Sequence, residues 1–512
     1  MRNVLEWLET AAQACPDKLA VADESTRLTF AELEAKARAI GSALAGCVHA
    51  GEAVALYAEK SADVLAAMLG TAYAGGFYSL IDTRQPKVRV EAILAALSPA
   101  AVITDAAHAE TAAEMLADTG YEALMLEELA ARPADDGALA AARAAAIDTD
   151  PLYCNFTSGS TGTPKGVLVS HRSVIDFIPV FCSTFGIDAD DVIANQAPFD
   201  FDVSVKDIYS MLCACASMHI IPREYFSTPT KLMDFLCDRE ATTLIWAVSA
   251  MCFVSIMNGF GYRVPTSIGK VMFSGEVMPP KQLRIWQKWL PDATYVNLYG
   301  PTEITCNCTY HILDKDRDYS EYIPIGRPFP NEDVFLLDSE NRRITEKGIK
   351  GMIVVRGTAL ALGYYGMAEK TNECFVQDPL NSSYPERVYL TGDLGMYDDN
   401  GELRFCGRTD NQIKYMGHRI ELEEVERAMS AIDGVERCIC VFDEPKQRLK
   451  GYYVGTIDKN ELYSVMKKSM PAFMIPGYLR QIEQVCLSKN GKLDRKKTIE
   501  MIGGVKGAKG DK

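Results

Sequence analysis

The sequence predicts an α/β protein with a large N-terminal domain and a small C-terminal α+β domain. The chain has 512 residues, 48% of them hydrophobic, which is enough for more than one core. Short apolar runs alternate with helical periodicity at residues 54–57, 61–73, 77–81, 88–97 and 101–104. Such alternation is typical of parallel or mixed sheets flanked by helices.

The rest of the N-terminal domain is expected to change from helices to antiparallel strands. The alanine-rich stretch 106–146 predicts surface helices, because alanine has the highest helix propensity. A strand is expected at 152–156. Later runs at 351–355 and 401–406 are typical of antiparallel strands, with a turn signal at Asp399-Asn400-Gly401.

The pattern changes near Arg408. A helix, two strands and a second helix are expected after it, at residues 421–430, 438–442, 451–454 and 459–468. These elements span roughly 100 residues, the size of a small domain. We therefore expect a large domain, a hinge, a small mobile domain and a disordered Gly/Lys-rich tail at 1–407, 408–411, 412–502 and 503–512.

Composition excludes some classes of partner. The net charge of −16 argues against binding to nucleic acid or anionic lipid, which attract basic surfaces. Glu6, Glu9 and Asp17 interrupt the apolar residues at the N-terminus, so a signal peptide is not expected. No run approaches the roughly 18 apolar residues of a membrane span. We expect a cytoplasmic protein without nucleic-acid partners or membrane insertion.

The 15 cysteines are scattered, with pairs spaced i, i+2 at 213/215, 306/308 and 438/440. Each pair would share one face of a strand. A metal or redox site is one interpretation, although the sequence has no C-x-x-C motif to support it. Reduced, mostly buried thiols are the interpretation that we prefer.

A loop suited to phosphate binding follows the strand expected at 152–156. Residues 157–166 carry five hydroxyl side chains, three glycines and one lysine. Glycines let the backbone approach an anion, and hydroxyls donate to phosphate oxygens. Pro164 and Gly166 exclude a Walker A loop, and a solvated turn is the alternative. The candidate phosphate contacts are Thr157, Ser158, Gly159, Ser160, Thr161, Gly162, Thr163 and Lys165.

This decapeptide resembles the signature loop of the adenylate-forming superfamily, which includes acyl-CoA synthetases, luciferases and nonribosomal peptide synthetase adenylation domains. The resemblance covers almost the whole chain, from Leu28 to Asp494, with its motifs in family order. It implies that the loop holds the β- and γ-phosphates of ATP. It also implies that the small domain rotates about a hinge residue, matched by Asp410.

Residues 297–303 supply an aromatic ring, a tight turn, a hydroxyl and a carboxylate, which chemistry at an α-phosphate needs. The resemblance implies that Tyr299 stacks on adenine and that Asn297 meets the amino edge of the base. It implies that Thr302 contacts the α-phosphate and that Glu303 binds Mg²⁺. It also assigns three further residues to the ATP site, Gly275, Glu276 and Gly300.

Asp393 has a carboxylate suited to both ribose hydroxyls, although Thr-Gly-Asp is also a common turn. The resemblance implies that Arg408 supports it. Lys492 follows an Asn-Gly turn, and the resemblance makes it the charge that neutralises carboxylate attack on the α-phosphorus. In the second orientation of the small domain, Lys414 and Gly417 would line the path of the thiol.

Residues 199–207 resemble the segment of amino-acid-activating members in which an aspartate, here Asp202, binds the substrate α-ammonium. The alternative role for Asp202 is the N-cap of a helix expected at 204–212. The resemblance is closer still to stand-alone D-alanine:D-alanyl carrier protein ligases. The pocket positions that it assigns are Val203, Lys206, Ala247, Met272, Ser274, Leu298, Cys306 and Asn307.

Lys206 departs from the D-alanine ligases, which carry an apolar residue there. It could bind a second substrate carboxylate or a hydroxyl, extend to the surface, or pair with an acid such as Asp207. We expect a small or polar amino acid as substrate. Because the chain ends soon after Lys492, we expect the phosphopantetheine thiol of a separate carrier protein as acceptor. A stand-alone acyl-CoA synthetase is the alternative.

Overall fold

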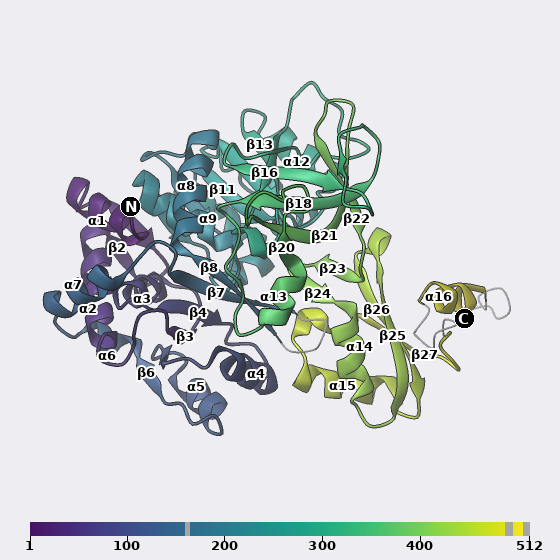
Figure 1. Ribbon diagram of the computed structural model, residues 1–512, viewed down its shortest axis with the longest axis horizontal. Helices are drawn as coiled ribbons and strands as arrows, with labels where there is room; N and C mark the ends of the chain where they lie inside the picture. The colour runs from purple at the N-terminus through teal and green to yellow at the C-terminus, as the bar shows by residue number, and fades with distance from the viewer. Residues whose placement is uncertain (159–163, 487–494, 505–512) are drawn as a thin grey trace. The chain divides into compact units, whose positions relative to one another are not determined.

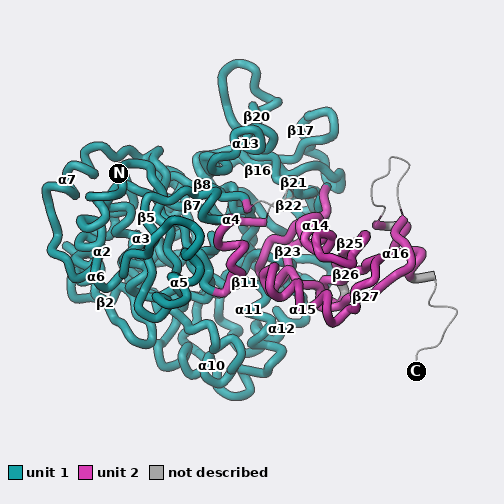
Figure 2. Tube along the Cα trace, turned by 90° about the horizontal axis from the view of Figure 1, so that it is seen from below, with its two compact units in different colours: residues 1–83, 93–156, 165–409 teal, residues 84–92, 157–164, 410–512 magenta. Residues whose placement is uncertain are grey.

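The computed structural model describes residues 1–158, 164–486 and 495–504 (Figure 1). The chain divides into two compact units (Figure 2). Unit 1 comprises residues 1–83, 93–156 and 165–409, and unit 2 comprises residues 84–92, 157–164 and 410–512. The predicted α/β class, with a large N-terminal part and a small C-terminal part, is confirmed.

The larger sheet of unit 1 has nine strands. In spatial order they are β15 (Arg327–Pro328), β14 (Thr309–Ile312), β13 (Thr294–Tyr299), β12 (Lys270–Ser274), β11 (Thr243–Ala247), β9 (Val192–Asn195), β10 (Ser217–Ile220), β1 (Leu19–Ala22) and β2 (Arg27–Thr29). The pairs from β13 through β10 are parallel. Their carboxyl ends therefore share one edge, which is where ligands bind in open α/β sheets.

Helices cover both faces of this sheet. They are α1 (Leu5–Ala14), α8 (His171–Phe185), α9 (Val203–Ala214), α10 (Pro229–Asp238), α11 (Val248–Ile256) and α12 (Pro280–Trp289), with the 3₁₀ turns η1 (Arg223–Ser227), η2 (Gly259–Gly261) and η3 (Thr302–Ile304). Apolar side chains of α1, α8 and α9 belong to one hydrophobic core, and those of α10 to α12 belong to a second.

A second sheet of unit 1 has seven strands. In spatial order they are β19 (Gly363–Tyr364), β8 (Lys165–Ser170), β7 (Pro151–Thr157), β4 (Phe77–Ile81), β3 (Ala53–Tyr57), β5 (Ala101–Thr104) and β6 (Ala123–Met125). Its helices are α2 (Phe30–Leu44), α3 (Ala62–Tyr73), α4 (Lys87–Leu97), α5 (Ala109–Leu116), α6 (Leu126–Ala130) and α7 (Asp136–Ala145). The stretch 106–146 is therefore mostly helical as predicted, but it also contributes the edge strand β6, which the prediction missed.

The third sheet of unit 1 is antiparallel, as expected for residues 351–355 and 401–406. Its strands are β16 (Glu332–Leu337), β17 (Arg343–Ile344), β18 (Gly351–Gly357), β20 (Phe375–Gln377), β21 (Arg387–Tyr397) and β22 (Leu403–Arg408). Helix α13 (Ala368–Cys374) precedes β20. This sheet supplies Asp393 from β21 and Arg408 from β22.

Unit 2 has an α+β arrangement. Its elements are β23 (Gln412–Tyr415), β24 (His418–Glu421), α14 (Leu422–Ser430), β25 (Val435–Asp443), η4 (Glu444–Lys446), β26 (Arg448–Gly455), α15 (Lys459–Ser469), η5 (Ala472–Met474), β27 (Tyr478–Gln481) and α16 (Arg495–Gly504). Strands β25, β26 and β27 form one sheet and β23–β24 a hairpin. The tail predicted to be disordered from residue 503 begins inside α16, and its remainder lies outside the described residues.

The cysteine interpretation is partly corrected. Cys213 lies in helix α9 and Cys215 follows it in the left-handed region, so this pair shares no strand face. Cys438 and Cys440 do lie on one strand, β25, and both are buried. All cysteines are free thiols. Over the described ranges, no three Asp, Glu, His or Cys side chains gather as a metal site, and no helix could cross a bilayer.

Candidate functional site

The predicted pocket positions lie at the carboxyl ends of β11, β12 and β13. Ala247 pairs with Ser274, and Met272 pairs with Val296. Paired residues of parallel strands face the same side, and side chains alternate along each strand. Ala247, Met272, Ser274 and Leu298 therefore share one face of the sheet, the face on which Met272 and Leu298 join the core of α8 and α9.

Helix α9 begins directly after Asp202. This residue has helical dihedral angles, φ −59° and ψ −25°, and its side chain makes no capping hydrogen bond. A capping aspartate normally adopts an extended conformation that lets the carboxylate reach the N–H groups of the first turn. Asp202 therefore occupies the N-cap position that the alternative interpretation gave it, but its partly buried side chain does not act as a capping acceptor.

Lys206 is buried at 0% exposure, and its ammonium donates to Asn307 Oδ1 at 2.5 Å. It does not extend to the surface. Asp207, the acid that could have paired with it, accepts instead from Asn195 Nδ2 at 2.6 Å. The structure thus joins two predicted pocket positions, Lys206 and Asn307, in one hydrogen bond. Cys306 also contacts Asn307 Oδ1, and burial raises the pKa of its thiol to about 12.

The backbone around Asn307 is unusually constrained. Thr305 and Cys306 both have positive φ, 54° and 88°. Non-glycine residues seldom adopt this conformation, which costs about 1–3 kcal/mol unless the surroundings fix it. Gly300 is part of those surroundings, because a Cβ there would lie 2.5 Å from Asn307 Cα and from the Cys306 carbonyl. Gly300 therefore packs closely against the backbone that carries Asn307.

One hydrogen-bonded cluster joins the predicted adenine contact Tyr299 to the predicted ribose contacts Asp393 and Arg408. The Tyr299 hydroxyl donates to Asp393 Oδ2 at 2.6 Å, and the Arg408 guanidinium pairs with Asp393 Oδ1. Burial and the Asp393 charge together raise the pKa of Tyr299 well above its usual range, so the phenol remains a donor. Each carboxylate oxygen can accept two hydrogen bonds. Asp393 therefore retains capacity to accept ribose hydroxyls.

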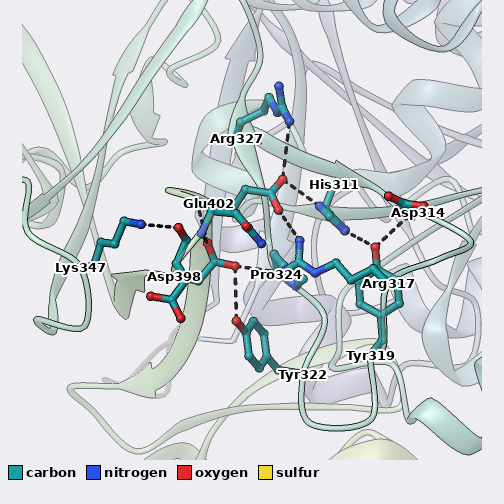
Figure 3. A network of polar contacts seen from close by, with 12 residues as sticks. His311, Asp314, Arg317, Tyr319, Tyr322, Pro324, Arg327, Lys347, Asp398 and Glu402 are labelled. Carbon is teal, nitrogen blue, oxygen red and sulfur yellow. Dashed lines mark hydrogen bonds and ion pairs between the residues drawn. The ribbon is translucent and has the colours of Figure 1, made fainter.

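Asn297 lies beside this cluster and donates from Nδ2 to the Pro324 carbonyl at 2.8 Å. The loop that carries Pro324 is fixed by a polar network that sequence reasoning missed (Figure 3). His311, the cross-strand partner of Asn297, contacts Glu402 at 2.9 Å and the Tyr319 hydroxyl at 2.8 Å.

Arg317 completes the network. Its guanidinium donates to Glu402 Oε2 at 2.7 Å and to Asp398 Oδ2 at 2.9 Å (Figure 3). These bonds connect the loop after β14 with the turn between β21 and β22. The network therefore joins the strand of the predicted adenine contact to the sheet of the predicted ribose contacts.

Glu303 lies in η3 and is buried at 0% exposure. Its Oε1 accepts a hydrogen bond from the Tyr364 hydroxyl at 2.7 Å. The Lys165 ammonium, at the end of the predicted phosphate loop, lies 5.6 Å from the centre of the Tyr364 ring. Glu303 and Lys165 thus both lie close to Tyr364, another residue that sequence reasoning did not identify. Thr302 begins the same 3₁₀ turn.

Several described site residues belong to unit 2. The Ser158 hydroxyl donates to the Arg419 carbonyl at 2.7 Å. Asp410 Oδ1 accepts from the Gln412 N–H at 3.2 Å. Lys414 lies on β23, and Gly417 lies in the β23–β24 turn with φ +80°. Asp410, Lys414 and Gly417 thus lie at the start of unit 2, within or next to one hairpin.

The other site residues are placed more briefly. Val203 is the first residue of α9, and Gly275 (φ +95°) and Glu276 follow β12. Thr157 is the last residue of β7, one position beyond the predicted strand end. The predicted phosphate contacts Gly159, Ser160, Thr161, Gly162 and Thr163, and the catalytic candidate Lys492, lie outside the described residues.

The motifs occur in the order described above for the adenylate-forming superfamily. Within it, residues 8–365 match the family described as AMP-binding enzyme. That match spans more than half of the 512 residues, so the chain belongs to the AMP-binding enzyme family.

The chain is similar to two tyrocidine synthases. The chain is 31% identical over 503 residues to tyrocidine synthase 3 of Brevibacillus parabrevis, covering 96% of this chain and 7% of that protein. It is 28% identical over 503 residues to tyrocidine synthase 1 of the same organism, covering 97% of this chain and 44% of that protein. The chain therefore spans less than half of each of these relatives.

Solved structures share the fold over nearly the whole chain. PA1221, an NRPS protein containing adenylation and PCP domains, superposes with a TM-score of 0.83 at 23% identity, covering 98% of this chain and 84% of that one. IdnL1 gives a TM-score of 0.78 at 28% identity, with 95% and 99% covered. o-Succinylbenzoate CoA synthetase of Bacillus subtilis gives 0.83 at 19% identity, with 98% of each chain covered.

Proposed function

We propose that this protein uses ATP to activate an amino acid as aminoacyl-AMP, and then transfers the aminoacyl group to the phosphopantetheine thiol of a separate carrier protein. The observation that carries the proposal is Asp202. It lies partly buried at the start of α9, the helix that carries Lys206, whose ammonium donates to Asn307. A partly buried carboxylate is stabilised by a cationic ligand, and the α-ammonium of an amino acid is such a ligand.

The proposed reaction has two steps. In the first, a substrate carboxylate oxygen bonds to the α-phosphorus, the bond to the bridging oxygen breaks, and pyrophosphate leaves. In the second, a thiolate attacks the acyl carbon and AMP leaves. We assign Tyr299 and Asn297 to adenine, and Asp393 and Arg408 to the ribose. Lys492 would neutralise charge in the first step, because preorganised charge is usually the largest catalytic contribution.

The domain assignment is part of this proposal. We propose a large domain at 1–407, a hinge at 408–411 that contains Asp410, and a mobile domain at 412–502. One orientation would present Lys492 for adenylation, and the other would present Lys414 and Gly417 for thiol attack. One site cannot readily offer both surfaces at once, which is the physical reason for a rotation.

Glu303 fits a magnesium ion bound together with ATP. Mg²⁺ usually takes one or two carboxylates plus substrate phosphates and water, rather than an all-protein cage. Glu303 is a fully buried carboxylate, and Tyr364 orients it. The bound ion would withdraw charge from the phosphate oxygens. Within the described ranges no three metal-ligating side chains gather, which agrees with a single protein carboxylate.

Tyr364→Phe is expected to raise the Mg²⁺ concentration needed for half-maximal pyrophosphate exchange by roughly 10-fold or more. Removing a residue that orients a metal ligand typically costs 10–100-fold in metal affinity. The measurement is exchange rate against Mg²⁺ at saturating amino acid. Tyr365→Phe, which changes the adjacent tyrosine, is the control. An unchanged Mg²⁺ dependence would remove Glu303 from the proposed metal site.

Lys206 and Asn307 would select the substrate side chain. The Lys206 ammonium donates to the neutral amide oxygen of Asn307. The same proposed pocket also contains Met272 and Leu298, which are buried. A lysine has three donors, so a substrate hydroxyl or carboxylate could bind alongside Asn307. We propose a small or polar amino acid, with serine, cysteine and an acidic amino acid all open.

Lys206→Met is expected to shift preference towards D-alanine or L-alanine and away from a polar or acidic amino acid. The measurement is the ratio of kcat/KM for the two substrates in wild type and variant, because specificity is that ratio. Leaving a substrate polar group without its partner costs about 1–3 kcal/mol, so the ratio should fall about tenfold or more. An unchanged ratio would mean that Lys206 only supports Asn307.

One experiment tests the proposed function as a whole. Pyrophosphate exchange is measured with the twenty L-amino acids, D-alanine, D-serine and several fatty and aryl acids. We expect exchange with an amino acid. Exchange with a non-amino acid alone would identify an acyl-CoA synthetase, and no exchange with any acid would contradict adenylation. The carrier partner is supported by PA1221, which combines adenylation and PCP domains in one protein.

A further inference from the structure

Lys60 connects the two mixed sheets of unit 1. It lies between β3 of the seven-stranded sheet and α3, yet its ammonium reaches the carboxyl end of β9 in the nine-stranded sheet. Nζ donates to Asn195 Oδ1 at 2.9 Å, to the Asn195 carbonyl at 3.1 Å and to the Gln196 carbonyl at 2.8 Å. One ammonium thus fixes both the backbone and the side chain where β9 ends.

The Lys60 ammonium itself is largely removed from solvent. Burial lowers the pKa of Lys60 to about 7, and the charges of Asp207, Asp200 and Glu59 oppose that shift. A buried ammonium is costly unless it is paired and hydrogen-bonded. The Asn195 and Gln196 oxygens supply the hydrogen bonds, so Lys60 holds the chain where β9 ends.

From Asn195, the network continues into helix α9. Asn195 accepts from Lys60 through Oδ1 and donates through Nδ2 to Asp207 Oδ2 at 2.6 Å. Asp207 is buried at 0% exposure, and its Oδ1 has no hydrogen-bond partner among the described residues. The next residue towards the N-terminus of α9 is Lys206, which donates to Asn307. A shift of Asp207 would therefore move the lysine of the pocket.

From Gln196, a second branch reaches helix α11. Gln196 Oε1 accepts a hydrogen bond from the Ala247 N–H at 3.2 Å. Ala247 ends β11 and precedes the first turn of α11. The segment that Lys60 fixes then runs on to Asp202, six residues after Gln196. Both branches thus end at positions assigned to the amino acid.

We propose that Lys60 and Asp207, which do not contact the substrate, are positioning residues for the amino-acid pocket. Lys60 fixes the segment from Asn195 to Asp202 and, through Asn195, orients Asp207 and the helix that carries Lys206. The inference depends on the proposed function, because it takes this pocket as the amino-acid site. It requires that loss of the network weakens amino-acid binding and leaves ATP binding intact.

The test compares two lysines that both hold backbone carbonyls near α9. Lys60→Met removes the ammonium at the pocket end, whereas Lys18→Met removes an ammonium that donates to the Cys215 carbonyl at 2.6 Å, at the opposite end of α9. Both variants should lower Tm. Lys60→Met should raise the amino-acid KM about tenfold or more with the ATP KM unchanged, since charged hydrogen bonds are at stake. Lys18→Met should change neither constant.

Asp207→Asn, which keeps the side-chain shape, provides a second test of the positioning role if Lys60→Met does not fold. It should also raise the amino-acid KM selectively. In the double variant, the increase should be smaller than the product of the two single effects, because both changes disrupt one network. Equal changes in both KM values, or the same profile in Lys18→Met, would show that Lys60 only stabilises the fold. If the proposed function itself were wrong, the result would differ, because the wild type would show pyrophosphate exchange with no amino acid.

Discussion

Asp202→Ala is expected to raise the KM for the amino acid on the order of 10²-fold or more, with the KM for ATP nearly unchanged. Asp202 is partly buried at the start of α9 and makes no capping bond there. Its loss would strand the α-ammonium in a partly buried site, and an unpaired buried charge costs about 3–5 kcal/mol. Pyrophosphate exchange with each substrate varied in turn measures both constants.

The control for this prediction changes the substrate. Wild type should prefer the amino acid strongly over the corresponding acid without the amino group, and Asp202→Ala should lose most of that preference, because the two deletions remove one charge pair. Asp202→Asn keeps the side-chain size and should behave like the alanine variant. A preference that survives in both variants would mean that another group binds the ammonium, and would favour the acyl-CoA synthetase alternative.

Strand positions were predictable where burial leaves a continuous apolar run. The expected strands at 77–81 and 101–104 coincide with β4 and β5, in which every residue is buried. Such runs arise because helices cover both faces of a parallel strand. The edge strand β6 was missed, because its three residues are partly or fully exposed and lie in an alanine-rich stretch.

Individual site residues were predictable, whereas their partners were not. Tyr299 and Asp393 came from separate motifs, and their hydrogen bond joins residues 94 positions apart. Lys206 and Asn307 are 101 positions apart, and Glu303 and Tyr364 are 61 apart. A local pattern reports the conformation of its own segment, but not which distant side chain folding brings to it.

Asp202 and Lys60 both show what a local sequence pattern cannot predict about a side chain. The spacing before α9 correctly placed Asp202 at the N-cap position, but it could not show that the side chain makes no capping hydrogen bond. Lys60 gave no signal, because a lysine after a strand is usually a solvated charge. Its contacts with Asn195 depend on how two sheets pack against each other, which no local pattern in the sequence encodes.

Lys492→Ala is expected to lower the rate of adenylate formation ~10²–10³-fold while sparing thioester formation from pre-made aminoacyl-AMP. Lys492 lies outside the described residues, and its role follows from the Asn490-Gly491-Lys492 motif. Charge develops at the α-phosphorus only in the first step, so its loss should slow that step alone. Pyrophosphate exchange measures the first step, and single-turnover reaction of synthetic aminoacyl-AMP with carrier thiol measures the second.

Two further lysine variants in unit 2, Lys414→Ala and Lys468→Ala, serve as comparisons for Lys492→Ala. Lys414→Ala should give the reciprocal pattern, with thiol transfer slowed and exchange retained, because Lys414 is assigned to the other orientation. Lys468→Ala, an exposed lysine of α15, should change neither step. Equal losses in both half-reactions for Lys492→Ala would contradict the two-orientation proposal, since one orientation would then serve both steps. If Lys492→Ala slows only adenylate formation and Lys414→Ala slows only thiol transfer, two surfaces of the small domain must act in turn.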